Sequence, residues 1–242
     1  GVPSQVFITM PINHKQETIM LNETRYTADI GMYASDRPRN DVMQGDKVLA
    51  RGTCHWRTEA CKGCYNEKLE RVFKAMIPKD VKNEIFWQQL DGDKFNTILS
   101  RKRKDTSRFR FQTRGETFAS IADVLRVKDI LKKNPDTIFW MPTRAWRNPF
   151  LKNLIESHIF PLANARTLAS TDIYTHGREW KQLKETNWPT MFFGNDDLKT
   201  TPNGDKFFLC PKTHKDLKGH CGICKAGCFR NNKRVDVHLK QH

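Results

Sequence analysis

Residues 108–144, RFRFQTRGETFASIADVLRVKDILKKNPDTIFWMPTR, decide the fold class. Polar and apolar residues alternate with period two from Arg108 to Gln112, which predicts a strand. The apolar residues of 121–131 recur at helical spacing, and Asn134-Pro135 ends that helix. Thr137 to Met141 is a continuous apolar run, typical of a strand buried in a parallel sheet. This stretch therefore predicts one strand–helix–strand unit.

The same alternation extends to both sides of this unit. Further strands are expected at 47–51, 166–170, 190–194 and 206–209, and further helices at 65–76, 85–99 and 150–159. Pro78 is expected to end the first of these helices, and Asn148-Pro149 to begin the last. Strands recur at intervals of roughly 30 residues, which favours right-handed crossovers between parallel strands. We therefore predict an α/β fold whose first wound strand is Lys47–Arg51.

Three parts are expected along the 242 residues. Residues 1–45 form an N-terminal extension with one or two strands, and residues 46–209 form the wound α/β domain. Residues 210–242 form a small cysteine-rich lobe. This last part has few large apolar side chains, so we expect a metal to hold it together.

The chain is strongly basic, with 42 Lys and Arg against 27 Asp and Glu and a net charge of +15. Such a charge favours binding to phosphate backbones through counterion release, so nucleic acid or a nucleic-acid-bound protein is the expected partner. The alternative is a basic surface that is only well solvated. The densest run, Arg101 to Lys104, is either part of a binding face or a solvated loop.

Several classes of protein are excluded by what the sequence lacks. No run of 18 apolar residues occurs, so no membrane-spanning helix is expected. The first residues, GVPSQVFITM, show no secretory pattern, and clustered thiols are typical of a reducing cytoplasm. No phosphate-binding Walker loop, Ser–His–Asp pattern or carboxylate cluster indicates hydrolysis. Nothing in the sequence indicates an oligomeric state.

Seven cysteines occur in two groups at opposite ends of the chain. They are Cys54, Cys61 and Cys64, then Cys210, Cys221, Cys224 and Cys228. Three thiolates leave one metal position open, as a reactive iron–sulfur cluster requires, whereas four close a structural zinc or a second cluster. For the first group, the alternatives are a structural zinc with His55 or a more distant His as fourth ligand, or free buried thiols. In the second, His214, His220 or His238 could replace a cysteine at a zinc ion.

The first cysteine group follows the expected strand 47–51, and the next strand ends in Arg114-Gly115-Glu116. In this order the chain resembles radical S-adenosylmethionine (SAM) enzymes, which have a three-cysteine loop after their first strand and Gly-Gly-Glu after the second. The resemblance implies a partial TIM-like (βα)6 barrel of parallel strands, a [4Fe–4S] cluster on Cys54, Cys61 and Cys64, and bound SAM. It also implies cofactor contacts at strand ends, from Arg114, Gly115, Glu116, Arg144, Ser170, Thr171 and Asn195, and catalytic roles for Glu116 and Asp172.

The chain from residue 46 onward is also similar to a group of phage proteins. They share a pair like Cys64-Tyr65 and a C-terminal lobe like Cys221-Gly222-Ile223-Cys224 with a final His, here His242. The sequence departs from the radical SAM pattern at the spacing of its first two cysteines and at Arg114, where that family has glycine. Outside the resemblance, Glu116 is a carboxylate suited to a helix N-terminus, and Asp172 is suited to capping a turn.

Two functions follow as hypotheses. The first is a phage-type iron–sulfur enzyme, resembling radical SAM enzymes, that acts on or is bound to nucleic acid in the host cytoplasm. The alternative is a non-catalytic basic protein, stapled by zinc or a cluster, that binds DNA, RNA or a polymerase.

Overall fold

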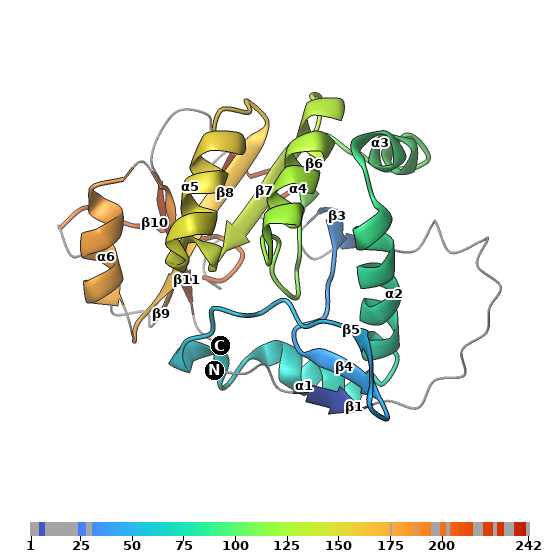
Figure 1. The fold of residues 1–242 in the computed structure, drawn as a ribbon. Coiled ribbons are helices and arrows are strands. Elements are labelled where there is room, and N and C mark those ends of the chain that lie inside the picture. Colours follow the sequence, from blue (N-terminus) through green and yellow to red (C-terminus); the bar gives the residue numbers. More distant parts are fainter. Residues whose placement is uncertain are drawn as a thin grey trace.

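The structure is a computed structural model. It describes residues 5–7, 24–27, 31–174, 176–186, 188–194, 199–201, 204–214, 220–224, 227–229 and 235–240. These form one eight-stranded sheet, one three-stranded sheet and six α-helices (Figure 1). Within this part of the chain, no helix has the length and apolar character needed to cross a bilayer.

The large sheet is mostly parallel and singly wound. Its strands are β2 (Thr24–Thr27), β3 (Met32–Ser35), β6 (Arg108–Arg110), β7 (Ile138–Thr143), β8 (Ala165–Asp172), β9 (Thr190–Gly194), β10 (Phe208–Leu209) and β11 (Asp236–Lys240). In space they follow the order β10-β11-β9-β8-β7-β6-β3-β2, and the pairings are parallel except between β2 and β3. From β3 to β9, each crossover moves one strand along in the same direction, which places the helices that connect β6 to β9 on one face.

This arrangement confirms the predicted α/β class with parallel strands, but not a barrel. Among the described strands, β2 and β10 are the two edges, so the sheet is open. Seven of the predicted strands and helices occupy their expected places, including α4 (Ile121–Lys133), α5 (Pro149–His158) and strands β6 to β9. The start of α5 is as expected, because Asn148 accepts hydrogen bonds from the amides of Phe150 and Leu151.

One face of the large sheet packs on helices. Figure 1 shows α4 and α5 side by side on it. Alternate strand residues meet apolar helix residues in a core in which Phe109, Phe111, Phe139, Met141, Val124, Val127, Ile130 and Ile155 are all buried. Burying side chains of this size contributes about 1.5–3 kcal/mol each. The period-two and helical patterns in residues 108–144 therefore correspond to the main core.

The opposite face of the sheet packs on the C-terminal segment. Here Trp140 and Leu168 form a second core with Phe229 and Val237, and Cys210, Cys221 and Cys228 pack against it. Strand β11 lies between β9 and β10 inside the large sheet. The segment expected to form a separate C-terminal lobe thus contributes an interior strand to the main fold.

The prediction that Lys47–Arg51 starts the wound sheet is wrong. Strand β5 (Lys47–Ala50) belongs to the small sheet with β1 (Gln5–Phe7) and β4 (Asp41–Gln44). Strand β3, in the expected N-terminal extension, takes its place beside β6. Both faces of β3 are covered, because Met32 and Ala34 on one face are 1% and 0% exposed and Tyr33 on the other face is 7% exposed, whereas Lys47 is exposed. The β4–β5 hairpin is an insertion between β3 and the first cysteine loop.

Two helix boundaries also differ from the prediction. Helix α1 (Tyr65–Val72) ends before Pro78, which instead lies in the first turn of α2 (Met76–Gln89). A proline fits there because the first amides of a helix have no intrahelical acceptor. The expected helix 85–99 is divided between α2 and α3 (Gly92–Ser100), because the Asp91 side chain accepts the amide hydrogen of Lys94 and starts a new helix. Helix α6 (His176–Lys184) completes the set.

We expect Val237→Ala to destabilise the whole domain by about 2 kcal/mol, because Val237 is fully buried between β9, β10 and the C-terminal segment. Chemical denaturation followed by circular dichroism should show one transition, shifted to lower denaturant. The matched control is Ile223→Ala, also in the C-terminal segment but 67% exposed, which should change stability by less than about 0.5 kcal/mol. A separate early transition in Val237→Ala would mean that the C-terminal segment folds independently.

Candidate metal and cofactor site

The first cysteine loop lies at the carboxyl ends of three neighbouring strands, β6, β7 and β8. The Glu116 amide donates to Thr53 Oγ1 at 2.8 Å, next to Cys54. Thr58 Oγ1 donates to Asp172 Oδ2 at 2.6 Å, at the end of β8. Arg144 Nη1, after β7, donates to both Thr58 Oγ1 at 3.0 Å and Asp172 Oδ2 at 2.8 Å. The structure therefore brings the predicted loop and the predicted strand-end residues together.

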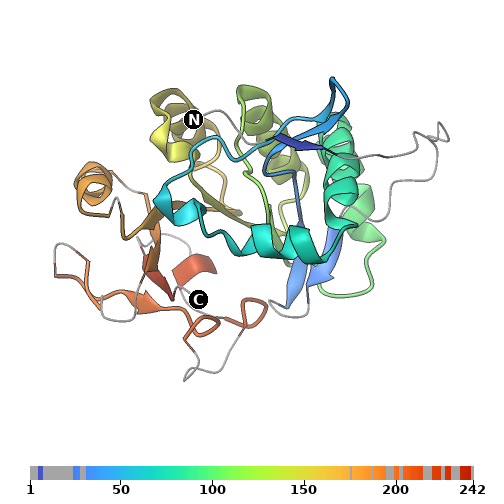
Figure 2. The same cartoon turned by 90° about the horizontal axis from the view of Figure 1, so that it is seen from below.

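The loop reaches this edge by a route that the sequence did not indicate. After the β4–β5 hairpin the chain returns alongside residues 37–39, where Thr53 N donates to the Pro38 carbonyl at 2.9 Å. Residues 37–39 directly follow β3, which is the strand beside β6. Seen from below, the cyan segment with the first cysteine loop and α1 crosses in front of the sheet (Figure 2). The loop is thus held beside the end of β3, although β5 precedes it in sequence.

The three loop cysteines are partly buried and not in disulfides. Burial, together with the nearby Glu116 carboxylate, raises the pKa of Cys54 to about 12, while Arg57 and Arg39 act in the opposite direction. Burial would lower the pKa of Arg144, but Cys61 and the hydrogen bond to Asp172 raise it above its ordinary value. Cationic guanidinium groups therefore lie near these thiols and would stabilise thiolates bound to a metal.

The donor set matches a metal site in its chemistry, since it offers three thiols from one loop. As the structure describes them, however, no three His, Cys, Asp or Glu side chains are placed to hold a metal ion. Metal binding at this loop would therefore require the side chains of Cys54, Cys61 and Cys64 to move closer to one another. Convergence of Cys54, Cys61 and Cys64 on one metal stays a prediction.

Glu116 is engaged by the protein itself. Its carboxylate accepts hydrogen bonds from the amides of Thr117 (2.8 Å), Phe118 (3.2 Å) and Arg144 (2.9 Å), and from Thr143 Oγ1 (2.7 Å). Burial raises the pKa of Glu116, and these hydrogen bonds lower it in part. The carboxylate joins the end of β6 to the end of β7, and four protein donors already use its acceptor positions.

The two residues before Glu116 also make close contacts. Arg114 pairs with Asp80 on α2 and lies 3.5 Å from Asp36. Gly115 has φ +79°, and a Cβ atom there would lie 2.7 Å from both the Arg37 carbonyl oxygen and Thr53 Oγ1. Glycine is required at this position because the chain needs a left-handed conformation and because the cysteine loop passes directly over it.

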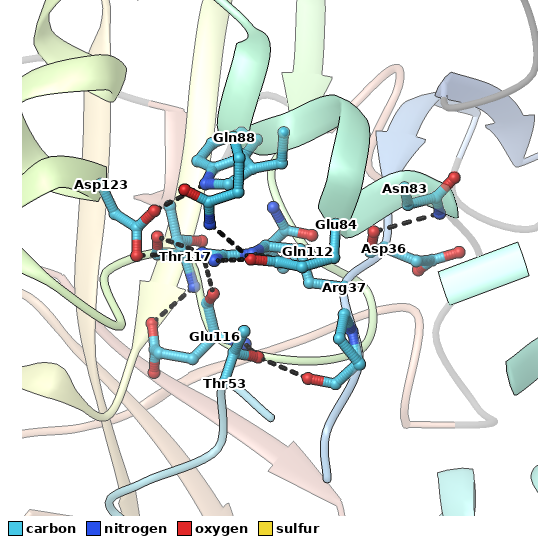
Figure 3. Close-up of polar contacts among 12 residues, drawn as sticks. Asp36, Arg37, Thr53, Asn83, Glu84, Gln88, Gln112, Glu116, Thr117 and Asp123 are labelled. Carbon is cyan, nitrogen blue, oxygen red and sulfur yellow. Dashed lines mark hydrogen bonds and ion pairs between the residues drawn. The ribbon is translucent and has the colours of Figure 1, made fainter. Parts of the chain in front are cut away.

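A buried ion network surrounds this edge, centred on Arg37 (Figure 3). Its Nε and Nη2 donate to the Glu84 carboxylate at 2.6 and 2.8 Å, and its Nη1 lies 3.2 Å from Asp123 Oδ2. The same Nη1 donates to the carbonyls of Glu116 and Thr117. Sequence reasoning missed Arg37, because an arginine in the polar stretch 36–41 carries no motif.

Asp172 is a buried carboxylate with cationic neighbours. Burial alone would raise its pKa, but hydrogen bonds from Thr58 and Arg144 and the charges of Arg144 and Arg147 hold the pKa below its ordinary value. Its other oxygen accepts the amide hydrogen of Tyr174, as expected of a turn cap. Asp172 is therefore ionised and fixed in place.

The other predicted cofactor residues are less connected to the loop. Ser170 accepts a hydrogen bond from Trp146 Nε1 at its carbonyl. Thr171 is fully buried, and its hydroxyl has no hydrogen-bond partner within the described part of the chain. Asn195 lies outside the described residues, as does His242.

The second cysteine group lies elsewhere on the sheet. Burial raises the pKa of Cys221 to about 11, and burial together with the charges of Cys210, Cys221 and Cys224 raises the pKa of Cys228. As at the first loop, no three of these side chains are placed to hold a metal ion in the described part of the chain. Arg108 Nη1 donates to the carbonyls of Cys221 and Cys224 at 2.5 and 2.8 Å. Arg108 begins β6, whereas the first cysteine loop lies beyond its end, so the two groups occupy different ends of the sheet.

The nearby histidines take different positions. His214 Nε2 lies 3.0 Å from His238 Nδ1, and the Cys210 amide donates to the His238 carbonyl. The ring of His220 lies against Gly31, and its Nδ1 is buried with no hydrogen-bond partner among the described residues.

We expect Gly115→Ala to destabilise the protein by about 2–4 kcal/mol, from a left-handed backbone and a collision with Arg37 and Thr53. The matched control is Gly63→Ala in the cysteine loop, where a Cβ atom would meet nothing within 4 Å. Denaturant unfolding measures both variants. Equal stabilities would contradict the close approach of the loop to β6.

The family profile of Gene product 88 matches residues 34–218, and no radical SAM family matches. The matched span runs from β3 to just before Cys221, and includes the first cysteine loop, the strand-end residues and Cys210. No curated protein and no solved structure matches the chain. Because the matched residues cover more than half of the 242, the chain belongs to the Gene product 88 family, a phage-type family.

Proposed function

We propose that this protein is an iron–sulfur protein that resembles radical SAM enzymes and acts on, or is bound to, nucleic acid in the host cytoplasm. One observation carries the proposal. The loop with Cys54, Cys61 and Cys64 is hydrogen-bonded to residues at the ends of three consecutive parallel strands. The carboxyl ends of parallel strands are where α/β enzymes bind their ligands.

The strand order supports this proposal. Strands β3, β6, β7, β8 and β9 lie side by side in chain order, followed by β11. Six parallel strands wound in one direction resemble the open, partial barrel that the proposed family has. The β4–β5 hairpin inserted before the cysteine loop is a departure from the simple strand–loop order.

The cluster ligands would be Cys54, Cys61 and Cys64. Once reduced by an external electron donor, a [4Fe–4S] cluster held by these residues would supply the one electron that radical SAM chemistry requires. The protein's own residues would support it: Arg39 and Arg144 carry positive charge beside the thiols, since these thiols contribute to the raised pKa of both guanidinium groups. Asp172 holds Arg144 and the loop residue Thr58 in place.

The cofactor itself would lie along the strand ends. The resemblance assigns its contacts to Arg114, Gly115, Glu116, Arg144, Ser170, Thr171 and Asn195. Of these, Thr171 has a buried hydroxyl that pairs with nothing described, so a ligand's polar group would remove an energetic cost there. Cys210, Cys221, Cys224 and Cys228 would hold a second [4Fe–4S] cluster or a zinc ion.

The proposed nucleic-acid partner rests on charge. The net charge is +15, and the run Arg101 to Lys104 follows α3. Arg101 and Arg103 are exposed, while the ammonium groups of Lys102 and Lys104 lie 5.3 and 3.9 Å from the ring centres of Tyr33 and Tyr26. Such contacts fix the direction of two lysines and keep positive charge on one surface.

The second candidate is a non-catalytic basic protein stapled by zinc. The occupied carboxylate of Glu116 favours it, because four protein donors bind the group that the resemblance assigns to the cofactor. The ion pair of Arg114 with Asp80 also favours this candidate, because it engages another residue that the resemblance assigns to the cofactor. In that case the cysteine groups only fix the fold, and the basic surface binds nucleic acid.

Anaerobic purification should give a brown protein with several irons and sulfides per chain. Cys61→Ala with Cys64→Ala should remove the iron of the first group, and Cys221→Ala with Cys224→Ala the metal of the second, because each group holds its metal through thiolates. Metal and sulfide analysis and electron paramagnetic resonance of the reduced protein measure this. SAM should change the resonance of the wild type but not of the Cys61/Cys64 variant.

A colourless protein with one or two zinc ions would establish the alternative. If the protein contains iron but SAM does not change its electron paramagnetic resonance spectrum, the protein is a binding protein whose cluster only stabilises the fold. The Cys221/Cys224 variant is the matched control for the first loop, because it removes the same number of thiols from the other group.

Nucleic-acid binding should weaken steeply with salt, with a slope set by the number of phosphates contacted. Replacing Arg101, Lys102, Arg103 and Lys104 by Gln should reduce affinity and flatten this slope. The control makes the same charge change at exposed positions elsewhere: Lys82, Lys132, Lys181 and Lys199. Fluorescence anisotropy with labelled DNA and RNA at several salt concentrations measures both. Equal losses in the two variants would show attraction by overall charge, without a binding face at 101–104.

A further inference from the structure

A cavity of about 490 Å³ lies between α1, the start of α2, β2 and the end of β6. Its volume is within the range of sites that bind small molecules. Neither Glu116 nor any cysteine lines it. The residues that matter most for its chemistry are Thr27, Tyr65, Phe73, Lys79, Arg110 and Arg114.

Two buried polar atoms of the cavity lining lack hydrogen bonds. They are Thr27 Oγ1 on β2 and Arg110 Nε on β6, and neither has a partner within the described part of the chain. A buried donor or acceptor without a partner costs about 1–3 kcal/mol, so such atoms are normally satisfied by water or a ligand. Both residues line the same cavity, which is therefore where water or a polar ligand would satisfy these two atoms.

The cavity carries a net positive charge. Arg114 is neutralised by Asp80, but Lys79 and Arg110 form no ion pair with a described carboxylate. The Arg110 guanidinium instead lies 4.7 Å from the ring centre of Trp140, which fixes its position. Two unneutralised cations in a concave site favour an anion of about two charges, such as a phosphate monoester.

The remaining wall is apolar and aromatic. Tyr65, Leu69 and Phe73 recur at helical spacing, which predicts that they form the face of a helix that packs on the core. In the structure Tyr65 and Phe73 remain 57% and 56% exposed and line the cavity. The Tyr65 hydroxyl donates to the Thr113 carbonyl at 3.2 Å, which holds its ring at the cavity. Exposed aromatic rings beside cations are the groups on which nucleobases stack.

We propose that this cavity binds a nucleoside phosphate, with the phosphate at Lys79 and Arg110 and the base against Tyr65 and Phe73. The ligand is either a free mononucleotide or the phosphorylated end of a nucleic-acid strand, which share this chemistry. The inference deepens the proposed function by naming the substrate class. It does not depend on a cluster, because no cysteine lines the cavity.

Isothermal titration calorimetry of the full chain with AMP, GMP, CMP and UMP tests the proposal, with the matching nucleosides and inorganic phosphate as further probes. We expect nucleotides to bind at least 10-fold tighter than nucleosides, because the charge-assisted contacts to Lys79 and Arg110 require the phosphate. A 5′-phosphorylated oligonucleotide that binds tighter than any mononucleotide would identify a strand end as the ligand, and the reverse order a free nucleotide.

The variants separate the two parts of the site. Lys79→Gln should weaken nucleotide binding about 10-fold and leave nucleoside binding unchanged. Tyr65→Ala should weaken both by a similar factor, whereas Tyr65→Phe keeps the ring and loses only the hydrogen bond to Thr113, so its loss of affinity should be smaller. Lys68→Gln is the matched control, since Lys68 is an exposed lysine of α1 outside the cavity.

Three results would overturn the proposal: no binding of any nucleotide at millimolar concentration, equal affinity for nucleotides and nucleosides, or equal effects of Lys79→Gln and Lys68→Gln. Metal analysis of the same samples keeps the tests independent. If the protein binds nucleotides but contains no iron, the nucleotide site is supported and the proposed cluster is rejected. If the protein contains an iron–sulfur cluster but binds no nucleotide, the cluster is supported and the nucleotide site is rejected.

Discussion

The pairing of the buried Arg37 guanidinium with Glu84 and Asp123 is the interaction on which the carboxyl edge depends. Arg37 directly follows β3, Glu84 lies on α2, and Asp123 lies in the first turn of α4. The same side chain donates to two carbonyls of the loop after β6. One cation thereby joins two strand ends to two helices. Removing one partner of such a buried pair typically costs about 3–5 kcal/mol, because the other charges remain buried without compensation.

The path of the first cysteine loop follows from this network. Residues 37–39 are held at the end of β3, and the loop lies against them through its backbone hydrogen bonds. Its two threonines, Thr53 and Thr58, then bind the ends of β6 and β8. The cysteines themselves make few of these contacts. The loop therefore presents its thiols on a frame held by other residues, as a metal site requires of its supporting shell.

Strand β6 contributes side chains to the helix-covered core, to the second cysteine group and to the cavity beside α1. Its odd-numbered side chain, Phe109, packs with Phe111 into the helix-covered core. The even-numbered arginines face the other way: Arg108 binds the second cysteine group, and Arg110 lines the cavity beside α1. Arg114, just after the strand, pairs with Asp80 on α2. The period-two pattern that identifies the strand in the sequence thus also separates its apolar side chains, which enter the core, from its arginines, which face the second cysteine group and the cavity.

Local pattern alone was sufficient for the unit β6–α4–β7, for the Asn148 cap of α5, and for β8 and β9. In each, the hydrophobic period or the capping residue acts within a few residues of the chain. The position of the candidate site was also predictable in part. Parallel strands end at one edge, so polar residues after β6, β7 and β8, namely Glu116, Arg144 and Asp172, had to lie near one another.

Other features depended on contacts between distant residues, which the tertiary structure decides. Strand β3 joins the main sheet only because β6 and β2 cover its edges, and β11 only because β9 and β10 flank it. Neither segment has a local pattern strong enough to identify its partner. Likewise the family resemblance implies that Glu116 binds a cofactor. In the structure, its carboxylate instead accepts hydrogen bonds from Thr143 and Arg144 and from its own loop. The sequence by itself determined which residue types stand at strand ends. Only the folded chain decided which of them pair with each other. A buried charge or polar group is costly unless it has a partner, and these partners come from residues far away in the sequence.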